Sequence, residues 1–96
     1  MLFKVEMTVN IPATLPAAQA EEIKAREKAY SQQLQREGKW LHIWRVVGQY
    51  ANVSLFEVKD NQELHEIITG LPLFPYMEIS VQPLCQHPSS IYVEKP

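Results

Sequence analysis

Apolar and polar side chains alternate at the start of the chain. From Phe3 to Ile11 every odd position is apolar and every even position is polar, a period of two that is typical of a strand with one buried face. Pro12 ends the pattern, because proline has no backbone N–H to donate. The sequence therefore predicts a half-buried strand over residues 3–11.

The longest predicted element is a helix over residues 17–37. This segment lacks proline and glycine, is rich in strong helix formers, and is followed by Gly38 as a C-terminal stop. Five of its residues recur at intervals of three and four, so they share one face of the helix. They are Ala20, Ile23, Glu27, Tyr30 and Leu34. We expect this face to point at a sheet.

The middle of the chain predicts a pair of strands. Residues 40–47 and 50–58 are rich in aromatic and β-branched side chains, and Gly48-Gln49 separates them. This pattern is typical of a hairpin.

A short helix, a loop and a last strand complete the prediction. Residues 62–69 follow a capping Asp60 or Asn61 and precede Gly70, which predicts a helix. Two prolines exclude a regular element from residues 71–76. Residues 77–82 alternate again and predict the strand.

The element order β-α-β-β-α-β predicts an α+β fold of the ferredoxin-like, split βαβ type. Such a fold has an antiparallel four-stranded sheet with both helices on one face. With 96 residues, we expect one domain over residues 1–96. The uncovered sheet face and the small size favour association between copies, so we expect a homo-oligomer.

Composition narrows the possible partners and locations. Nine basic and eleven acidic residues give a charge of -2 without a basic stripe, so we expect no nucleic-acid partner. The apolar runs are too short for a bilayer, and the N-terminus lacks a secretory pattern, so we expect no membrane and a cytoplasmic protein. The single Cys85 and three scattered histidines predict neither a disulfide nor a metal site.

Glu27 is the most informative polar residue, because the helical spacing places a carboxylate on the face that should meet the sheet. Desolvation raises the pKa of a carboxyl group, and a raised pKa suits a base that must also return its proton near neutrality. Alternatively, Glu27 lies at the edge of the face and reaches water or pairs with Lys24 or Lys28.

Two charged or titratable residues stand out on the predicted strand 40–47. Simple alternation puts Trp40, His42 and Trp44 on one face and Leu41, Ile43, Arg45 and Val47 on the other. Arg45 on a largely apolar face requires an anionic partner, which is Glu57, Glu27 or a ligand carboxylate. His42 either serves a site or is a hydrogen-bonded histidine in an interface.

A polar row and several aromatic residues complete the set of candidates. Tyr50, Asn52 and Ser54 alternate on one face of the next strand, where fixed donors can polarise a carbonyl; a solvated or intersubunit face is the other interpretation. Phe74 is one of several aromatic residues that can wall an apolar pocket, although such residues usually fill cores and interfaces.

Four stretches of this sequence resemble the muconolactone delta-isomerase family. They are residues 34–40, the hairpin from His42-Ile43-Trp44-Arg45 to Tyr50-Ala51-Asn52, the loop Leu71-Pro72-Leu73-Phe74-Pro75-Tyr76-Met77, and the tail Cys85-Gln86-His87-Pro88-Ser89-Ser90-Ile91. The start, Met1-Leu2-Phe3 with Met7-Thr8-Val9, is also similar. The resemblance spans nearly the whole chain; only residues 13–16 and 92–96 depart from the family pattern.

The resemblance implies a cofactor-free isomerase that converts muconolactone to 3-oxoadipate enol-lactone in the catechol branch of the β-ketoadipate pathway. It also implies closed oligomers, decamers in the known form, with pockets near subunit boundaries. Within that chemistry we assign catalytic roles to Glu27, Tyr50 and Asn52, and substrate binding to Lys24, His42, Arg45, Ser54 and Phe74. Arg45 is the first choice for the substrate carboxylate and Lys24 the second.

Two alternative functions remain open from the sequence. A related enzyme would dehalogenate a chlorinated muconolactone, starting with the same proton abstraction. A non-catalytic ferredoxin-like binding module is the other alternative, because the fold alone does not settle function. An exposed Glu27 without an enclosed pocket would favour the binding module.

Overall fold

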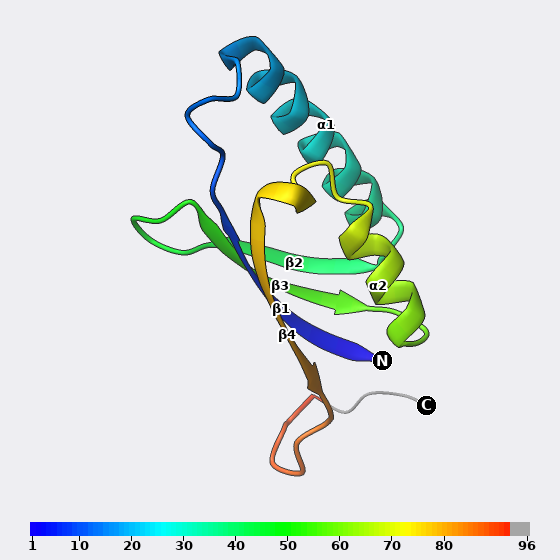
Figure 1. Ribbon diagram of the computed structural model, residues 1–96. Helices are drawn as coiled ribbons and strands as arrows, with labels where there is room; N and C mark the ends of the chain where they lie inside the picture. Colours follow the sequence, from blue (N-terminus) through cyan, green and yellow to red (C-terminus); the bar gives the residue numbers. More distant parts are fainter. Residues whose placement is uncertain (93–96) are drawn as a thin grey trace.

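The computed structural model describes residues 1–92 and has the predicted element order (Figure 1). Its elements are β1 (Leu2–Val9), α1 (Ala17–Arg36), β2 (Trp40–Arg45), β3 (Ala51–Glu57), α2 (Asn61–Thr69) and β4 (Met77–Leu84). The strands form one antiparallel sheet in the order β2-β3-β1-β4. The predicted α+β, ferredoxin-like architecture is confirmed, and residues 93–96 of the predicted domain lie outside the described residues.

Several boundaries differ from the prediction by a few residues. β1 ends at Val9, and the N–H of Asn10 instead donates to the carbonyl of Tyr76. The loop after α2 contains one short 3-10 turn, Phe74–Tyr76. β4 continues through Pro83 to Leu84, which is possible because β4 is an edge strand, where a missing N–H breaks no ladder hydrogen bond.

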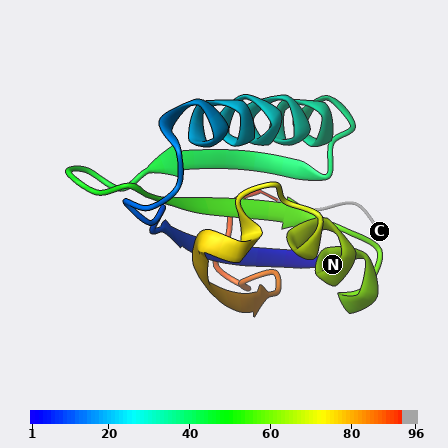
Figure 2. The ribbon, with the colours of Figure 1, turned by 45° about the horizontal axis from the view of Figure 1, so that its top comes forward.

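Both helices cover the same face of the sheet (Figure 2). The main core joins side chains from α1, α2 and the inner face of the sheet; its members include Phe3, Val5, Leu34, Trp40, Phe56, Leu64, Ile67 and Ile68. The rings of Trp40 and Phe56 pack with their centroids 4.6 Å apart. Asp60 caps α2 by accepting a 2.8 Å hydrogen bond from the N–H of Glu63.

A β-bulge in β2 corrects the predicted faces of that strand. Trp40 pairs with Phe56 and His42 with Leu55, so two residues of β2 advance while β3 advances one. Such an extra residue shifts every following side chain to the opposite face. Trp40 therefore shares the helix-covered face with Ile43 and Arg45, and its predicted grouping with His42 and Trp44 is wrong.

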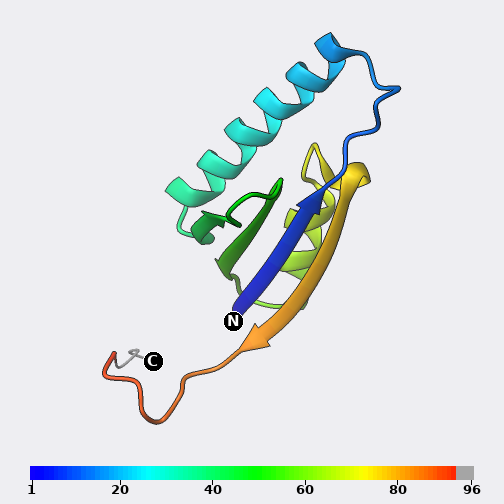
Figure 3. The ribbon, with the colours of Figure 1, turned by 90° about the vertical axis from the view of Figure 1, so that its left-hand side faces the viewer.

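The second face of the sheet carries no helix. His42 and Trp44 stack there with ring centroids 5.0 Å apart, and Trp44 is 52% exposed. The segment after β4 leaves the end of the sheet, away from both helices (Figure 3). Within residues 1–92, no helix combines the length and apolar character needed to cross a bilayer.

Candidate active site

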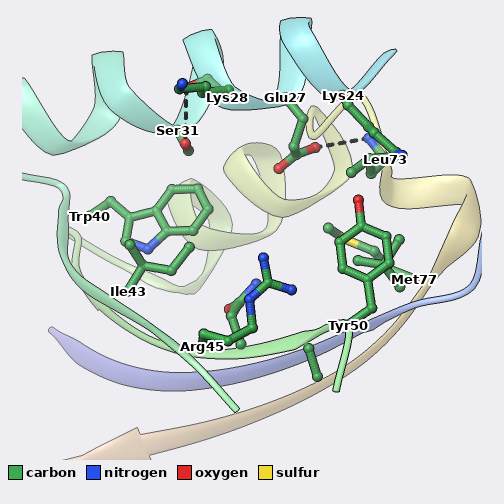
Figure 4. Close-up of a pocket in the computed structure, with 13 residues that line it drawn as sticks. Lys24, Glu27, Lys28, Ser31, Trp40, Ile43, Arg45, Tyr50, Leu73 and Met77 are labelled. Atoms are coloured by element: carbon green, nitrogen blue, oxygen red, sulfur yellow. Dashed lines mark hydrogen bonds between the residues drawn. The ribbon is translucent and has the colours of Figure 1, made fainter. Parts of the chain in front are cut away.

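A cavity of about 400 Å³ lies between α1 and the strands β2 and β3 (Figure 4). α1 forms one wall, the sheet forms the opposite wall, and Leu73 of the loop after α2 adds to the lining. Its lining combines an apolar floor with several polar or charged side chains. The lining residues are Val9, Lys24, Glu27, Lys28, Ser31, Trp40, Ile43, Arg45, Tyr50, Ala51, Asn52, Leu73 and Met77.

Glu27 points from α1 into this cavity and is half-buried (Figure 4). Its Oε1 accepts a 2.9 Å hydrogen bond from the backbone N–H of Leu73. Burial raises the pKa of the carboxyl group above its ordinary value of 4.5, and the Leu73 hydrogen bond opposes part of that rise. Lys24 pairs with Glu21 at 3.3 Å, and within residues 1–92 Glu27 forms no ion pair with Lys24 or Lys28, the two alternative partners.

Tyr50 lies across the cavity from Glu27, between two cationic side chains. The ammonium of Lys24 is 6.0 Å from the centre of the Tyr50 ring, and the guanidinium carbon of Arg45 is 5.4 Å from it. Both distances allow cation–π attraction. Arg45 also donates a long hydrogen bond of 3.4 Å to the carbonyl of Gln49. Within residues 1–92 it forms no ion pair with its predicted partners Glu57 and Glu27, and Glu57 instead pairs with the N-terminal ammonium at 3.6 Å. The guanidinium retains donors for a ligand.

A hydrogen bond from a buried serine orients the side-chain amide of Asn52. The Ser54 hydroxyl, which is 0% exposed, donates a 2.8 Å hydrogen bond to Oδ1 of Asn52. This bond orients the amide, and its Nδ2 lies 3.7 Å from the sulfur of Met7, a weak acceptor. The amide nitrogen of Asn52 therefore keeps a donor for a molecule in the cavity.

The structure brings five of the eight predicted site residues to this cavity: Lys24, Glu27, Arg45, Tyr50 and Asn52. Ser54 lies beneath the lining and acts on Asn52 rather than on the cavity. His42 lies on the opposite face of the sheet, because the β-bulge places it on the other face from Trp40. Phe74 lines a different cavity, between α2 and β4. Within residues 1–92, no three His, Cys, Asp or Glu side chains gather as a metal-binding group.

Sequence reasoning missed three polar features of the site. Lys28 and Ser31 lie near Glu27 on α1, and their spacing of four residues from Lys24 and Glu27, respectively, is the signal that could have included them. The Leu73 N–H left no such signal, because backbone groups of loops carry no side-chain pattern.

The arrangement suits proton transfer to and from carbon. A partly desolvated carboxyl group faces a phenol and an amide donor, and three cations line the cavity. Such donors stabilise an oxyanion while the carboxylate removes a proton. This half-buried Glu27 beside a cavity is the opposite of the arrangement that would favour a non-catalytic module.

Comparison with known proteins identifies the family. A family model described as muconolactone delta-isomerase matches residues 1–90. The chain is 68% identical to muconolactone delta-isomerase 1 of Acinetobacter lwoffii over 95% of each chain. It is 64% identical to muconolactone delta-isomerase of Cupriavidus pinatubonensis, over 95% of this chain and 99% of the relative.

A solved structure agrees with these sequence matches. The crystal structure of a muconolactone isomerase superposes with a TM-score of 0.94 at 51% identity, and the match covers 100% of both chains. Its agreement extends over the whole fold that positions the cavity. The chain therefore belongs to the muconolactone delta-isomerase family.

Proposed function

We propose that this chain isomerises muconolactone by moving one proton between two ring carbons, with Glu27 as the shuttle. The observation that carries the proposal is a carboxyl group with a raised pKa that points into a cavity beside donors and cations. Membership in the family supports the choice of substrate.

The reaction needs a base that becomes an acid. The Glu27 carboxylate removes the proton from the ring carbon that bears the ring oxygen, and the electron pair of that C–H bond moves through the double bond onto the lactone carbonyl. The resulting dienolate takes the same proton back at the carbon next to the carbonyl. The double bond has then moved by one position, and no oxidant or reductant is consumed.

Tyr50 and Asn52 are the proposed donors to the dienolate oxygen. Each well-aligned donor of this kind contributes about 2.7–4 kcal/mol of transition-state stabilisation. The hydrogen bond from Ser54 supports the role of Asn52, because it fixes which end of the amide faces the cavity.

Arg45 is the proposed partner of the substrate's carboxylate arm. A guanidinium binds a carboxylate through two parallel hydrogen bonds, and Arg45 makes only one long bond in the described structure. Lys24 stands on the opposite side of Tyr50 and is the second candidate. Proposed substrate contacts of His42 and Phe74 would require a second copy of the chain, because neither lines this cavity.

We also propose a cytoplasmic homo-oligomer, with the decamer as the expected form. The helix-free sheet face with exposed Trp44 supports association, and so does the cavity edge at Tyr50, which is 43% exposed in the single chain. Residues Cys85 to Tyr92, which extend from the body, supply a further surface for a neighbouring copy.

An ultraviolet assay of the purified protein with muconolactone tests the function. We expect turnover by the parent and a fall in kcat of about 10²- to 10⁴-fold in Glu27→Gln, which keeps the shape of the side chain but removes the base. Glu22→Gln, an exposed acid on the same helix whose partner Arg26 does not line the cavity, serves as the matched control and should retain the parent rate.

A chloride assay alongside the ultraviolet assay separates the alternatives. Release of chloride from 5-chloromuconolactone, without turnover of muconolactone, would replace the isomerase by the dehalogenase. A Glu27→Gln variant with the parent rate would remove Glu27 as the shuttle.

A further inference from the structure

α1 is joined to the end of α2 and its following loop at two points. The Tyr30 hydroxyl donates a 2.9 Å hydrogen bond to the carbonyl of Ile67, and the Leu73 N–H donates to Glu27 (Figure 4). Tyr30 and Glu27 are three residues apart, so they lie on one face of α1. Residues 67–73 are therefore held by the helix that carries the proposed base.

The acceptor of Tyr30 is an end carbonyl of α2. The last turns of a helix leave carbonyls without an intrahelical partner. Here the N–H of Gly70 bonds to Glu66, and the N–H of Leu71 bonds to Ile68, which leaves the carbonyl of Ile67 to the Tyr30 hydroxyl. This bond fixes the point at which the chain leaves α2 for Leu73.

Gly70 leaves room for that hydroxyl. Its φ of -84° is open to any residue, so backbone conformation does not require glycine there. A Cβ at this position would lie 2.8 Å from the Tyr30 hydroxyl oxygen, closer than real Cβ contacts, 3.1 Å from the backbone carbonyl oxygen of Glu66 and 3.5 Å from the Tyr30 Cζ. The missing side chain thus serves the Tyr30–Ile67 hydrogen bond.

We propose that Tyr30 is a positioning residue for the reaction: its hydroxyl holds the loop so that the Leu73 N–H keeps the Glu27 carboxylate directed into the cavity. Gly70 is the second member of this device, because any larger residue displaces the hydroxyl. The inference rests on the proposed role of Glu27 as the base.

The proposal predicts linked changes in rate and pH dependence. Without the Tyr30 hydroxyl, the loop moves, the Leu73 hydrogen bond weakens, and the carboxylate loses a stabilising donor. The charged and titratable groups that line the cavity around Glu27 are Lys24, Lys28, Arg45 and Tyr50. None of these four changes in the variants below, and residues 70–75 contain no titratable side chain. Tyr30 is also a titratable neighbour of Glu27, because burial and then the Glu27 charge raise its pKa, and only its hydroxyl is lost in Tyr30→Phe.

The experiment compares Tyr30→Phe, Gly70→Ala and the double variant with the parent. We expect each single variant to lower kcat about tenfold with KM nearly unchanged, because the base is misplaced while the rest of the cavity persists. The acid limb of the pH–kcat/KM profile should move to higher pH. In the double variant the losses should not multiply, because the new Cβ meets no hydroxyl.

A carboxyl ¹³C titration of Glu27, assigned with Glu27→Gln, gives a readout that does not require activity. The Glu27 pKa should rise further in Tyr30→Phe and stay at the parent value in Tyr76→Phe, whose lost hydroxyl makes no hydrogen bond within residues 1–92. If Gly70→Ala does not fold, Tyr30→Phe decides alone.

Three results would each overturn the positioning role. They are an unchanged kcat in Tyr30→Phe, an unchanged or lowered Glu27 pKa in that variant, and multiplied losses in the double variant. A parent protein without muconolactone turnover would instead overturn the proposed function. The titration would still decide whether Tyr30 positions the carboxylate.

Discussion

Two cavities of similar size lie under the helices, and they differ in chemistry. The cavity between α1 and the strands β2 and β3 has a volume of about 400 Å³ and gathers a carboxyl group, a phenol, an amide and three cations. The cavity between α2 and β4 has a volume of about 480 Å³, and His65 is its only titratable residue. Size therefore does not distinguish an active site from a gap in packing.

The first cavity differs from the second because hydrogen bonds from neighbouring residues hold its polar groups in place. Buried polar groups are costly unless they are hydrogen-bonded. The Leu73 N–H supports Glu27, and the Ser54 hydroxyl supports Asn52. Apolar side chains such as Leu64, Ile68 and Ile79 line most of the second cavity, which has no comparable arrangement in its lining.

The largest effect expected beyond Glu27 comes from Tyr50→Phe. Removal of one oxyanion donor should lower kcat about 10²- to 10³-fold. KM should change little, because the ring that Lys24 and Arg45 contact remains in place. Steady-state kinetics on Tyr50→Phe and on the control Tyr76→Phe check this prediction. Equal kcat values in the two variants would remove Tyr50 from the mechanism.

Arg45→Gln should act on binding. Loss of a charge-assisted pair to the substrate carboxylate should raise KM about 10- to 100-fold. Arg45→Lys should recover only part of the loss, because an ammonium lacks the two parallel donors. The exposed Arg36→Gln is the matched control. A larger rise of KM in Lys24→Gln than in Arg45→Gln would show that Lys24, and not Arg45, is the main partner of the substrate carboxylate.

The second cavity gives the opposite expectation. Ile68→Val removes one methylene group from the core and should lower the free energy of unfolding by about 1 kcal/mol. The kcat and KM of the folded protein should stay at the parent values. Urea unfolding together with kinetics measures both quantities. A loss of kcat in this variant would contradict the claim that only the first cavity serves catalysis.

The smallest effect is a pH-dependent gain of stability in Glu27→Gln. The native pKa of Glu27 is raised, so the folded protein binds this proton more tightly than the unfolded chain does. Its stabilising contribution is complete below the ordinary glutamate pKa and is lost as the pH rises through the raised value. The variant should match the parent in acid and be more stable near neutrality, as urea unfolding at both pH values would show.

The sequence predicted the fold because its signals are local. The alternation of residues 3–9 and the helical spacing of Ala20, Ile23 and Leu34 each act over a few neighbours, and both faces proved buried. Glu27 was found by the same spacing. These signals identify which residue lies on which face of an element.

The remaining features depend on contacts between distant segments. The bulge at Leu41, which moves Trp40 to the helix-covered face, follows from pairing with β3 and leaves no trace in the alternation. The Leu73 hydrogen bond joins residues 46 apart in sequence. For the same reason, the sequence could not place Phe74 in the second cavity or Ser54 beneath Asn52.

The most direct test of the account compares two pKa values in the parent protein. One is the pKa of the Glu27 carboxyl group from ¹³C titration, and the other is the pKa of the acid limb of kcat/KM for muconolactone. We expect the two values to coincide and to lie above the ordinary glutamate value of 4.5. A Glu27 that titrates at or below its ordinary value, or an acid limb that does not follow its titration, would contradict the proton shuttle.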